Sequence, residues 1–475
     1  MGAAKMVASQ APPALPGGCT SLPGKSRRGS APAADRSLIS KRNKVTRLGG
    51  TIHALNHDIL PMVFSLLDLF DVVRCSAVCK SWNRIINRSE ILPALCCKHW
   101  GSTWHSNLST CVETSFRKCM EDLVMKQHKL SMDRGKIDVY QWTAHSVGVY
   151  KCQMKMGLVL SGVGDKVMRL WSAESRRCLE EYSLSNMAPL VDFDFDESKI
   201  VGLIDTQLCI WRRSNGRCIF PSTGGTFPKG LCMRYLDPEA VVGCKDGSAR
   251  IFDMYSRKCS QIIRMCAGPI TCLSLGEDQL ILGGSSAGRI TIQGLSSGRQ
   301  IASLRPTDSA GGIQTLYYNN SSHLVFSGST AGYASSWDLR TMRKLWETRV
   351  SPNVICSMQG FCNDTSTLIV GGIDGVLRII DQQTGATLSS CVTTDDRKRR
   401  SSADMSMQMQ PGSSQGSLGV TERREGIRVL RGTRIDNLPR SARPPITCLA
   451  VGMKKVVTMH DTKYIRLWNF NSPTN

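Results

Sequence analysis

The chain of 475 residues has no long hydrophobic run and fewer acidic than basic residues, and we expect no secretory leader. Its most apolar stretch, residues 59–73, contains two aspartates and falls short of the ~18 consecutive apolar residues that a membrane-spanning helix needs. The N-terminal segment lacks the apolar core of a signal peptide. Met6 stands where an N-myristoylation pattern requires Ser or Thr. These absences predict a soluble protein of the cytoplasm, the nucleus or both, with no membrane partner.

Patterns that carry chemistry are also missing. The 8 histidines are scattered, and none of the 20 cysteines forms the C-x2-C spacing typical of zinc sites. No glycine-rich phosphate loop or nucleophile elbow occurs. The sequence therefore predicts a non-catalytic protein without metal or cofactor. In a long chain without a leader, the cysteines are expected to be reduced structural thiols.

Acidic residues are scarce in two segments in particular. Lys and Arg total 60 against 38 Asp and Glu, a net charge of +22. Residues 1–50 carry nine basic residues and one acidic residue, and residues 395–444 carry eleven and six. Both segments are rich in small and polar residues, so we expect them to be disordered. The cluster at 397–400, followed by two serines, is open to two interpretations: a solvated flexible run, or an import or phosphorylation signal.

A repeat organises most of the chain. From residue 164 onward, a tight turn, an alternating apolar segment and a Trp or its substitute recur seven times. The Trp-equivalent positions are Trp171, Trp211, Phe252, Gln293, Trp337, Ile380 and Trp468. Consecutive positions are 40, 41, 41, 44, 43 and 88 residues apart, so the last interval holds an insertion. Turn aspartates are expected at Asp165, Asp205, Asp246 and Asp374.

Four short strands in about 42 residues, repeated seven times, are typical of a closed β-propeller. Residues 136–475 resemble the WD-repeat family, although only Trp337-Asp338 spells the dipeptide that names it. The last repeat ends before its fourth strand, and residues 136–142 alternate apolar and polar side chains. We expect this segment to supply the missing strand and so close the ring.

Several cysteines follow the repeat period. Cys178, Cys218 and Cys259 each lie seven residues after a Trp-equivalent position. Four others are assigned to one shared position of the first strand, Cys232, Cys272, Cys356 and Cys448. Such period-locked thiols predict that each fills a small buried space in its repeat.

Residues 51–100 have helical rather than alternating apolar spacing. Their string Val78-Cys79-Lys80-Ser81-Trp82-Asn83-Arg84 resembles the second half of an F-box, whereas the usual Leu-Pro start is replaced by Leu55-Asn56. Asn56 or Asp58 is expected to cap the first helix and Asp71 the second. An ordinary helical subdomain is the alternative interpretation. An F-box ahead of WD repeats is a known family architecture, and this favours the F-box.

The predicted fold class is therefore mainly β: a seven-bladed WD-repeat propeller preceded by a small all-α F-box domain. The expected divisions are a disordered basic tail at 1–50, an F-box at 51–100, a helical linker at 101–135 and the propeller at 136–475. The disordered basic insertion is placed at about 394–444. In the linker, Val112, Phe116, Met120 and Leu123 form one apolar stripe.

The resemblance implies a substrate-recognition subunit of a Skp–cullin–F-box ubiquitin ligase, in the Ubl conjugation pathway. Its F-box would bind a Skp-family adaptor, and through it a cullin, while its propeller would bind an unidentified target protein. The expected adaptor-binding residues are apolar, namely Leu60, Pro61, Val63, Leu66, Leu67, Val72, Val73, Val78 and Trp82. Which of them face the adaptor and which face inward is left open by the sequence.

In rings of this kind, one position of each first strand usually faces the top, where a substrate would bind. Here that position holds Tyr150, Val191, Leu231, Thr271, Gln314, Ile355 and Thr447. None of these is basic, so an arginine-rich phosphopeptide pocket is not predicted. Including turn residues, the expected substrate-face residues are Tyr150, Lys245, Gln314 and His460. The alternative function is a non-ligase WD-repeat scaffold in an RNA or chromatin assembly, in which the basic tails contact nucleic acid.

Overall fold

The computed structural model describes residues 59–76, 78–92, 94–95, 125, 128–162, 166–183, 189–221, 228–307, 311–361, 364–395, 427–435, 438–452 and 454–471. The chain divides into two compact units, residues 1–104 and residues 105–475, and each is described by itself. No helix in these ranges is long and apolar enough to cross a membrane.

The described part of the first unit includes the short helices α1 (Ile59–Ser65), α2 (Leu69–Ser76) and α3 (Lys80–Arg88), with further helical residues at 91–92 and 94–95. Asp68 caps α2 by accepting a hydrogen bond from the backbone N–H of Asp71 at 2.8 Å, so the prediction that Asp71 is the cap was wrong. Asp71 instead lies in the first turn and pairs with Arg74. The predicted caps of α1, Asn56 and Asp58, lie outside the described residues.

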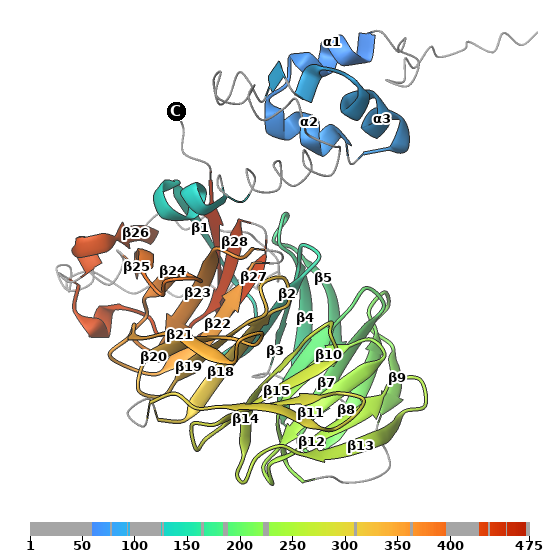
Figure 1. Ribbon diagram of the computed structural model, residues 1–475, viewed down its shortest axis with the longest axis vertical. Helices are drawn as coiled ribbons and strands as arrows, with labels where there is room; N and C mark the ends of the chain where they lie inside the picture. Colours follow the sequence, from blue (N-terminus) through green and yellow to red (C-terminus); the bar gives the residue numbers. More distant parts are fainter. Residues whose placement is uncertain are drawn as a thin grey trace, which may run out of the picture. The chain divides into compact units, whose positions relative to one another are not determined.

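The second unit consists of seven antiparallel sheets (Figure 1). The first three sheets in chain order are β2–β5 (Lys151–Lys155, Leu158–Gly162, Val167–Ser172, Cys178–Ser183), β6–β9 (Leu190–Phe195, Lys199–Ile204, Gln207–Arg212, Cys218–Pro221) and β10–β13 (Gly230–Leu236, Glu239–Cys244, Ser248–Asp253, Lys258–Arg264). The next two are β14–β17 (Ile270–Leu275, Leu280–Ser285, Ile290–Gly294, Gln300–Leu304) and β18–β21 (Ile313–Asn319, Leu324–Ser329, Tyr333–Asp338, Arg343–Arg349). The last two are β22–β26 (Ile355–Gly360, Thr367–Gly372, Leu377–Asp381, Thr387–Asp395, Ile427–Arg431) and β27, β28, β29 and β1 (Cys448–Gly452, Lys455–Met459, Tyr464–Phe470, Ile137–Thr143).

The first strands of the seven sheets form a continuous inner ring. Each of β2, β6, β10, β14, β18, β22 and β27 contacts the first strands of both neighbouring sheets, and β27 returns to β2. The sheets are therefore the blades of a closed seven-bladed propeller, as the repeat predicts. Apolar clusters fill the spaces between neighbouring blades, so the core is distributed around the ring.

Ring closure follows the sequence prediction. β1 pairs with β29 antiparallel over seven residue pairs, from Ile137 opposite Phe470 to Thr143 opposite Tyr464. The first described strand of the unit thus supplies the outer, fourth strand of the last blade and covers the edge of β29 that would otherwise be unpaired.

The Trp-equivalent positions occupy one place in every blade. Each lies on the third strand opposite the start of the second strand, as in Trp171 opposite Val159 and Trp468 opposite Val456. Asp246 accepts hydrogen bonds from the backbone and hydroxyl of Ser248 across its turn, and Asp374 accepts the backbone N–H of Val376. Asp165 lies outside the described residues.

Two expectations about this unit were wrong. The insertion between blades six and seven is not structureless throughout, because β26 adds a fifth strand to blade six and two 3-10 turns follow, η4 (Gly432–Ile435) and η5 (Arg440–Ala442). The period-locked thiols of the fourth strands are not buried either. Cys218 and Cys259 are exposed and Cys178 is half-buried, because the fourth strand is the outer edge of a blade.

Candidate protein-binding surfaces

Helix α1 is apolar on two faces. Leu60 and Phe64 point inward and are almost fully buried. The opposite face carries exposed apolar side chains at helical spacing, Ile59, Met62 and Val63, and Leu66 continues this spacing in the turn directly after the helix, where it is 86 % exposed. We call these four residues the outer stripe. A module whose surface helix shows its apolar face to solvent is incomplete without a partner.

The structure separates the predicted adaptor-binding residues into two groups. Leu60 and Val72 are 4 % and 0 % exposed, so they support the core of the module and were wrong as contact residues. The side chains with at least partial exposure are Pro61, Val63, Leu66, Leu67, Val73, Val78 and Trp82. Trp82 packs edge-on against Phe64 with ring centroids 5.2 Å apart, which links α3 to α1. Ile59 and Met62 belong to the exposed surface but were absent from the sequence prediction. The available signal was the i, i+4 spacing of Ile59 to Val63 and of Met62 to Leu66.

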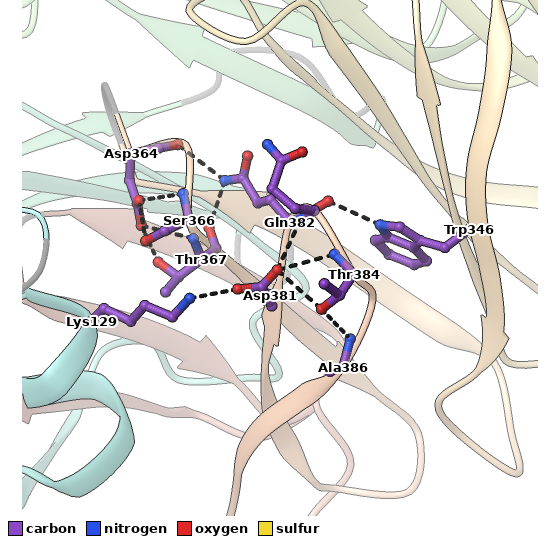
Figure 2. A network of polar contacts seen from close by, with 10 residues as sticks. Lys129, Trp346, Asp364, Ser366, Thr367, Asp381, Gln382, Thr384 and Ala386 are labelled. Carbon is purple, nitrogen blue, oxygen red and sulfur yellow. Dashed lines mark hydrogen bonds and ion pairs between the residues drawn. The ribbon is translucent and has the colours of Figure 1, made fainter.

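The connecting helix, residues 128–134, is anchored on blade six within the second unit (Figure 2). The Lys129 ammonium donates to the Asp381 carboxylate at 2.5 Å. His128 packs its ring edge-on against Phe361 at 4.4 Å. The apolar stripe predicted further upstream, Val112 to Leu123, lies outside the described residues.

Next to the contact between Lys129 and Asp381 lies a buried polar network that joins blades five and six (Figure 2). Gln382 donates through Nε2 to the carbonyl oxygens of Asp364 and Thr367, at 3.0 and 2.7 Å. Its own backbone oxygen accepts the indole N–H of Trp346 at 2.9 Å. Because burial would raise the pKa of Asp381 but Lys129 and Thr384 donate hydrogen bonds to it, the net pKa is lowered and the carboxylate stays ionised. The last helical turn before β1 is thus held to the ring by charge and by packing.

The expected substrate-face residues lie at one end of the blades, where the second strand turns into the third. We call this the turn end. Tyr150 precedes β2 and is 46 % exposed, and Gln314 and Lys245 are exposed at the corresponding end of blades five and three. A hydrogen bond to Asp461 raises the pKa of the Tyr150 hydroxyl. The strand register therefore brings these three residues to a common face.

His460 was wrong as a substrate-face residue, because it is 3 % exposed and held on both sides. Its Nδ1 lies 3.0 Å from the carbonyl oxygen of Pro445, so Nδ1 carries the proton and donates it. Nε2 then accepts the Thr458 hydroxyl at 2.7 Å, and that hydroxyl accepts the indole N–H of Trp468 at 2.9 Å. Burial lowers the pKa of His460 to about 3, so the ring is neutral and structural.

In blade one, His145 makes a corresponding chain of contacts to a hydroxyl and a Trp indole, but it is the other tautomer, protonated on Nε2. The guanidinium of Arg169 donates to Nδ1 of His145 at 2.8 Å, so Nε2 carries the proton. Nε2 then donates to the Ser161 hydroxyl at 2.8 Å, which also accepts the indole N–H of Trp171 at 2.9 Å. Sequence reasoning missed this arrangement. Its signal was a hydroxyl residue ten positions before the Trp in both blades.

The strand register also corrects the scan of the first strands. Ile355 is fully buried, and Cys356 occupies the position that Tyr150 and Gln314 hold in their blades, because the bulge in β22 falls between Ile355 and Ser357. For the same reason Cys356 lies one residue before the position shared by Cys232, Cys272 and Cys448.

Positive charge gathers at the turn end of blades three and four. The residues are Lys229, Lys245, Arg250, Arg264 and Arg289, which we call the basic cluster. The backbone N–H of Lys245 donates to the carbonyl oxygen of Lys229, and Arg264 lies opposite Ser248, so the backbone of blade three places these residues at one end, and Arg289 precedes β16 at the same end of blade four. Burial raises the pKa of Asp246, but hydrogen bonds from Ser248 and then the charges of Arg250 and Arg264 lower it, and the net pKa is lowered. Apart from Lys245, the sequence prediction missed this cluster, because it rested on one first-strand position and one turn position in each repeat.

Comparison with known proteins agrees with both units. The F-box domain model matches residues 52–93. An F-box/WD-40 repeat-containing protein of Arabidopsis thaliana is 49 % identical over 466 residues, which cover 93 % of this chain and 99 % of that protein. F-box/WD repeat-containing protein 2 of Mus musculus is 26 % identical over 144 residues, 30 % of this chain and 33 % of that protein.

Among solved structures, the computationally designed Ika8 protein aligns with 68 % of this chain and 84 % of its own, at 16 % identity and a TM-score of 0.48. The similarity to the Arabidopsis protein spans the helical module and the propeller in one alignment. The chain therefore belongs to the family of F-box/WD-40 repeat-containing proteins.

Proposed function

We propose that this protein is a non-catalytic substrate receptor of a Skp–cullin–F-box ubiquitin ligase. The observation that carries the proposal is the outer stripe of α1 on an F-box module, because family membership supplies the adaptor and the stripe supplies a surface for it. The catalytic effect of such a receptor is proximity: it holds target lysines near the charged ubiquitin enzyme and contributes no reacting group.

The outer stripe is large enough to support binding. Burying one Leu side chain fully is worth about 1.5–3 kcal/mol, and Leu66 is 86 % exposed in the isolated chain. Met62 and Val78 are 69 % and 63 % exposed and add apolar area nearby in the same module. A few such anchors carry most of the energy of a protein interface.

Leu66→Asp tests the proposal in the full-length chain. Placing a carboxylate in an apolar contact removes the burial energy of Leu66 and adds a desolvation cost, so adaptor binding should fall at least ~10-fold. The matched control is Leu130→Asp, the same change at a leucine that is 42 % exposed on the connecting helix of the other unit. Affinity purification, followed by quantification of the Skp-type adaptor and cullin, is the measurement.

Leu130→Asp should retain the adaptor at the wild-type level, and both variants should keep the wild-type circular dichroism spectrum. Equal adaptor recovery with Leu66→Asp and with wild type would refute the assignment of the outer stripe. Loss of adaptor in both variants would show that the added charge, and not its position, is responsible.

We propose further that the basic cluster selects an acidic segment of the target protein. Four of its five side chains are exposed, and like charges converging at one end of two neighbouring blades attract an anionic partner. The paired substitution Lys245→Glu and Arg264→Glu should reduce the recovery of specific target proteins and leave the adaptor bound. Lys258→Glu, on an exposed residue at the opposite end of blade three, is the control.

The same cluster bears on the alternative function, a scaffold in an RNA or chromatin assembly. Binding to nucleic acid through these cations would weaken steeply with salt concentration, whereas nuclease treatment would leave a protein target in place. Targets that disappear from the purified complex after nuclease treatment would favour the scaffold.

A further inference from the structure

Two cysteine side chains meet across the seam at which the propeller ring closes. Cys152 lies on β2 of the first blade and Cys448 on β27 of the last blade. The Cys152 thiol donates to the sulfur of Cys448, with the two Sγ atoms 3.7 Å apart and 296 residues between them in sequence. The two first strands are in direct contact, and both cysteines are free. A disulfide needs a sulfur separation of ~2.05 Å, so each sulfur has to move by less than ~1 Å.

The two thiols differ in exposure and in charge environment. Cys152 is 2 % exposed within the apolar cluster between blades one and seven, whereas Cys448 is half-buried. Burial raises the pKa of Cys152 well above its usual range. The hydrogen bond from Cys152, together with the Lys151 ammonium, lowers the pKa of Cys448 to about 6 despite its burial and the opposing charge of Asp192. The pair thus combines a sulfur of thiolate character, on a residue that is partly exposed, with a thiol on a fully buried residue beside it.

The surrounding groups favour reaction over metal binding. Lys151 and Arg234 both lie 3.5 Å from a carboxylate oxygen of Asp192, which places two cations and one anion near the pair. Within the described residues, no group of three or more His, Cys, Asp or Glu side chains is arranged to hold a metal ion.

We propose that Cys152 and Cys448 form a peroxide-sensitive thiol pair whose oxidation joins the first and last blades by a disulfide. The oxidant is a hydroperoxide. The Cys448 thiolate attacks the terminal peroxide oxygen, the O–O bond breaks, and the leaving alkoxide takes up a proton from water. Cys448 is then a sulfenic acid.

The Cys152 sulfur next attacks the sulfur of the sulfenic acid. The S–O bond breaks, the S–S bond forms, and the departing hydroxide takes the proton of the Cys152 thiol to give water. In sum, two thiols and one hydroperoxide give a disulfide, an alcohol and water, apart from protons exchanged with solvent. The two sulfurs lose two electrons and the peroxide gains them. Cys448 is the attacking residue and Cys152 the resolving residue.

The test uses the full-length chain treated with hydrogen peroxide, alkylated under denaturing conditions and digested with trypsin. The expected product is a reducible link between residues 152–155 and residues 441–454, the tryptic fragments that hold the two cysteines. Absence of this link overturns the proposal, and so does a link from Cys448 to Cys356, the thiol whose pKa Cys448 raises.

Single variants distinguish the two roles. In Cys152→Ser, the sulfenic acid at Cys448 has no resolving thiol and should be trapped by dimedone, whereas Cys448→Ser should leave Cys152 unlabelled. Cys272→Ser is the matched control, a buried thiol on the first strand of blade four, and should form the link at the wild-type rate. Dimedone labelling of Cys152 in the Cys448 variant would overturn the assigned order. The wild-type link decides the existence of the pair even where a variant fails to fold.

The link should also change stability in a way that a bystander disulfide would not. Because it closes a loop of nearly the whole propeller across the seam, oxidation should raise the unfolding temperature of the wild type by at least ~4 °C. Oxidation should leave the unfolding temperatures of Cys152→Ser and Cys448→Ser unchanged. An equal rise in these variants would show that other cysteines are responsible.

Discussion

The clearest structural prediction concerns Trp142 on the closing strand β1. Its side chain is 4 % exposed in the cluster between blades one and seven, with its ring centroid 6.0 Å from that of Trp171. The indole N–H of Trp142 donates no hydrogen bond within the described part of the chain, so Trp142→Ala loses packing and no polar contact. A Trp buries roughly 150–250 Å², which at about 25 cal/mol/Å² gives a loss of about 4 kcal/mol relative to Ala.

Hydrogen exchange of the full-length chain, read peptide by peptide, measures this loss and its extent. If β1 closes the ring, Trp142→Ala should accelerate exchange of the most protected amides in β29 and also in β13, on the far side of the ring. Thr143→Ala, an exposed position on the same strand, should change stability by less than about 0.5 kcal/mol. If Trp142→Ala accelerated hydrogen exchange in β29 alone, the prediction that β1 closes the ring cooperatively would be refuted. If Trp142→Ala and Thr143→Ala lowered stability equally, the packing energy assigned to Trp142 would be refuted.

Three further outcomes follow from the polar contacts. Ser161→Ala removes the acceptor of the Trp171 indole and should lower the free energy of unfolding by about 1–3 kcal/mol in denaturant titrations. Burial lowers the pKa of His460 to about 3, so as the pH falls the unfolded chain takes up a proton at this histidine before the folded chain does. The contribution of His460 to the free energy of unfolding is therefore complete above about pH 6.5 and is lost as the pH falls toward 3. His460→Gln should flatten this pH dependence. Lys129→Ala should lower the free energy of unfolding by less than about 1 kcal/mol, because the Lys129 side chain is 38 % exposed and solvent screens the ion pair, yet it should speed hydrogen exchange in residues 128–134. Because the pKa of Asp381 is lowered, the wild type loses the same contact only below about pH 3.9.

The sequence predicted those parts of the fold that repeat. The Trp-equivalent residues could be aligned without coordinates because each fills the same space opposite the start of the second strand, even where Gln293 or Ile380 replaces Trp. The closing strand could be predicted because a blade with three strands has an unpaired edge, and the alternating residues 136–142 were available to cover it. By contrast, β26 lies in a segment whose composition is that of a disordered chain, and its pairing with β25 as a fifth strand has no counterpart among the described strands of the other blades, so the repeat could not predict it.

Burial of single side chains was harder to predict, because the period of the repeat gives the strand on which a residue lies and not how exposed its side chain is. Cys259 follows the period as regularly as Cys272 does, yet the first lies on an outer strand and is exposed, whereas the second lies on the inner ring and is buried. Helix α1 poses the same problem on a smaller scale. Leu60 and Leu66 are equally apolar in the sequence, and only the packing of α3 against α1 shows that Leu60 is inside and Leu66 outside.

The basic cluster shows what a search for binding residues in a propeller has to include. Lys229, Lys245, Arg264 and Arg289 are 16 to 25 residues apart along the chain, yet each borders a turn at the same end of blades three and four. At its turn end, a blade exposes the beginnings of its first and third strands and the ends of its second and fourth strands. One position in each repeat therefore samples only a fraction of this end. Because net charge sums over tails and ring alike, the +22 of the chain gave no sign of this local convergence. In such a ring, recognition residues are therefore best sought as sets of turn positions in neighbouring blades, compared at a common register.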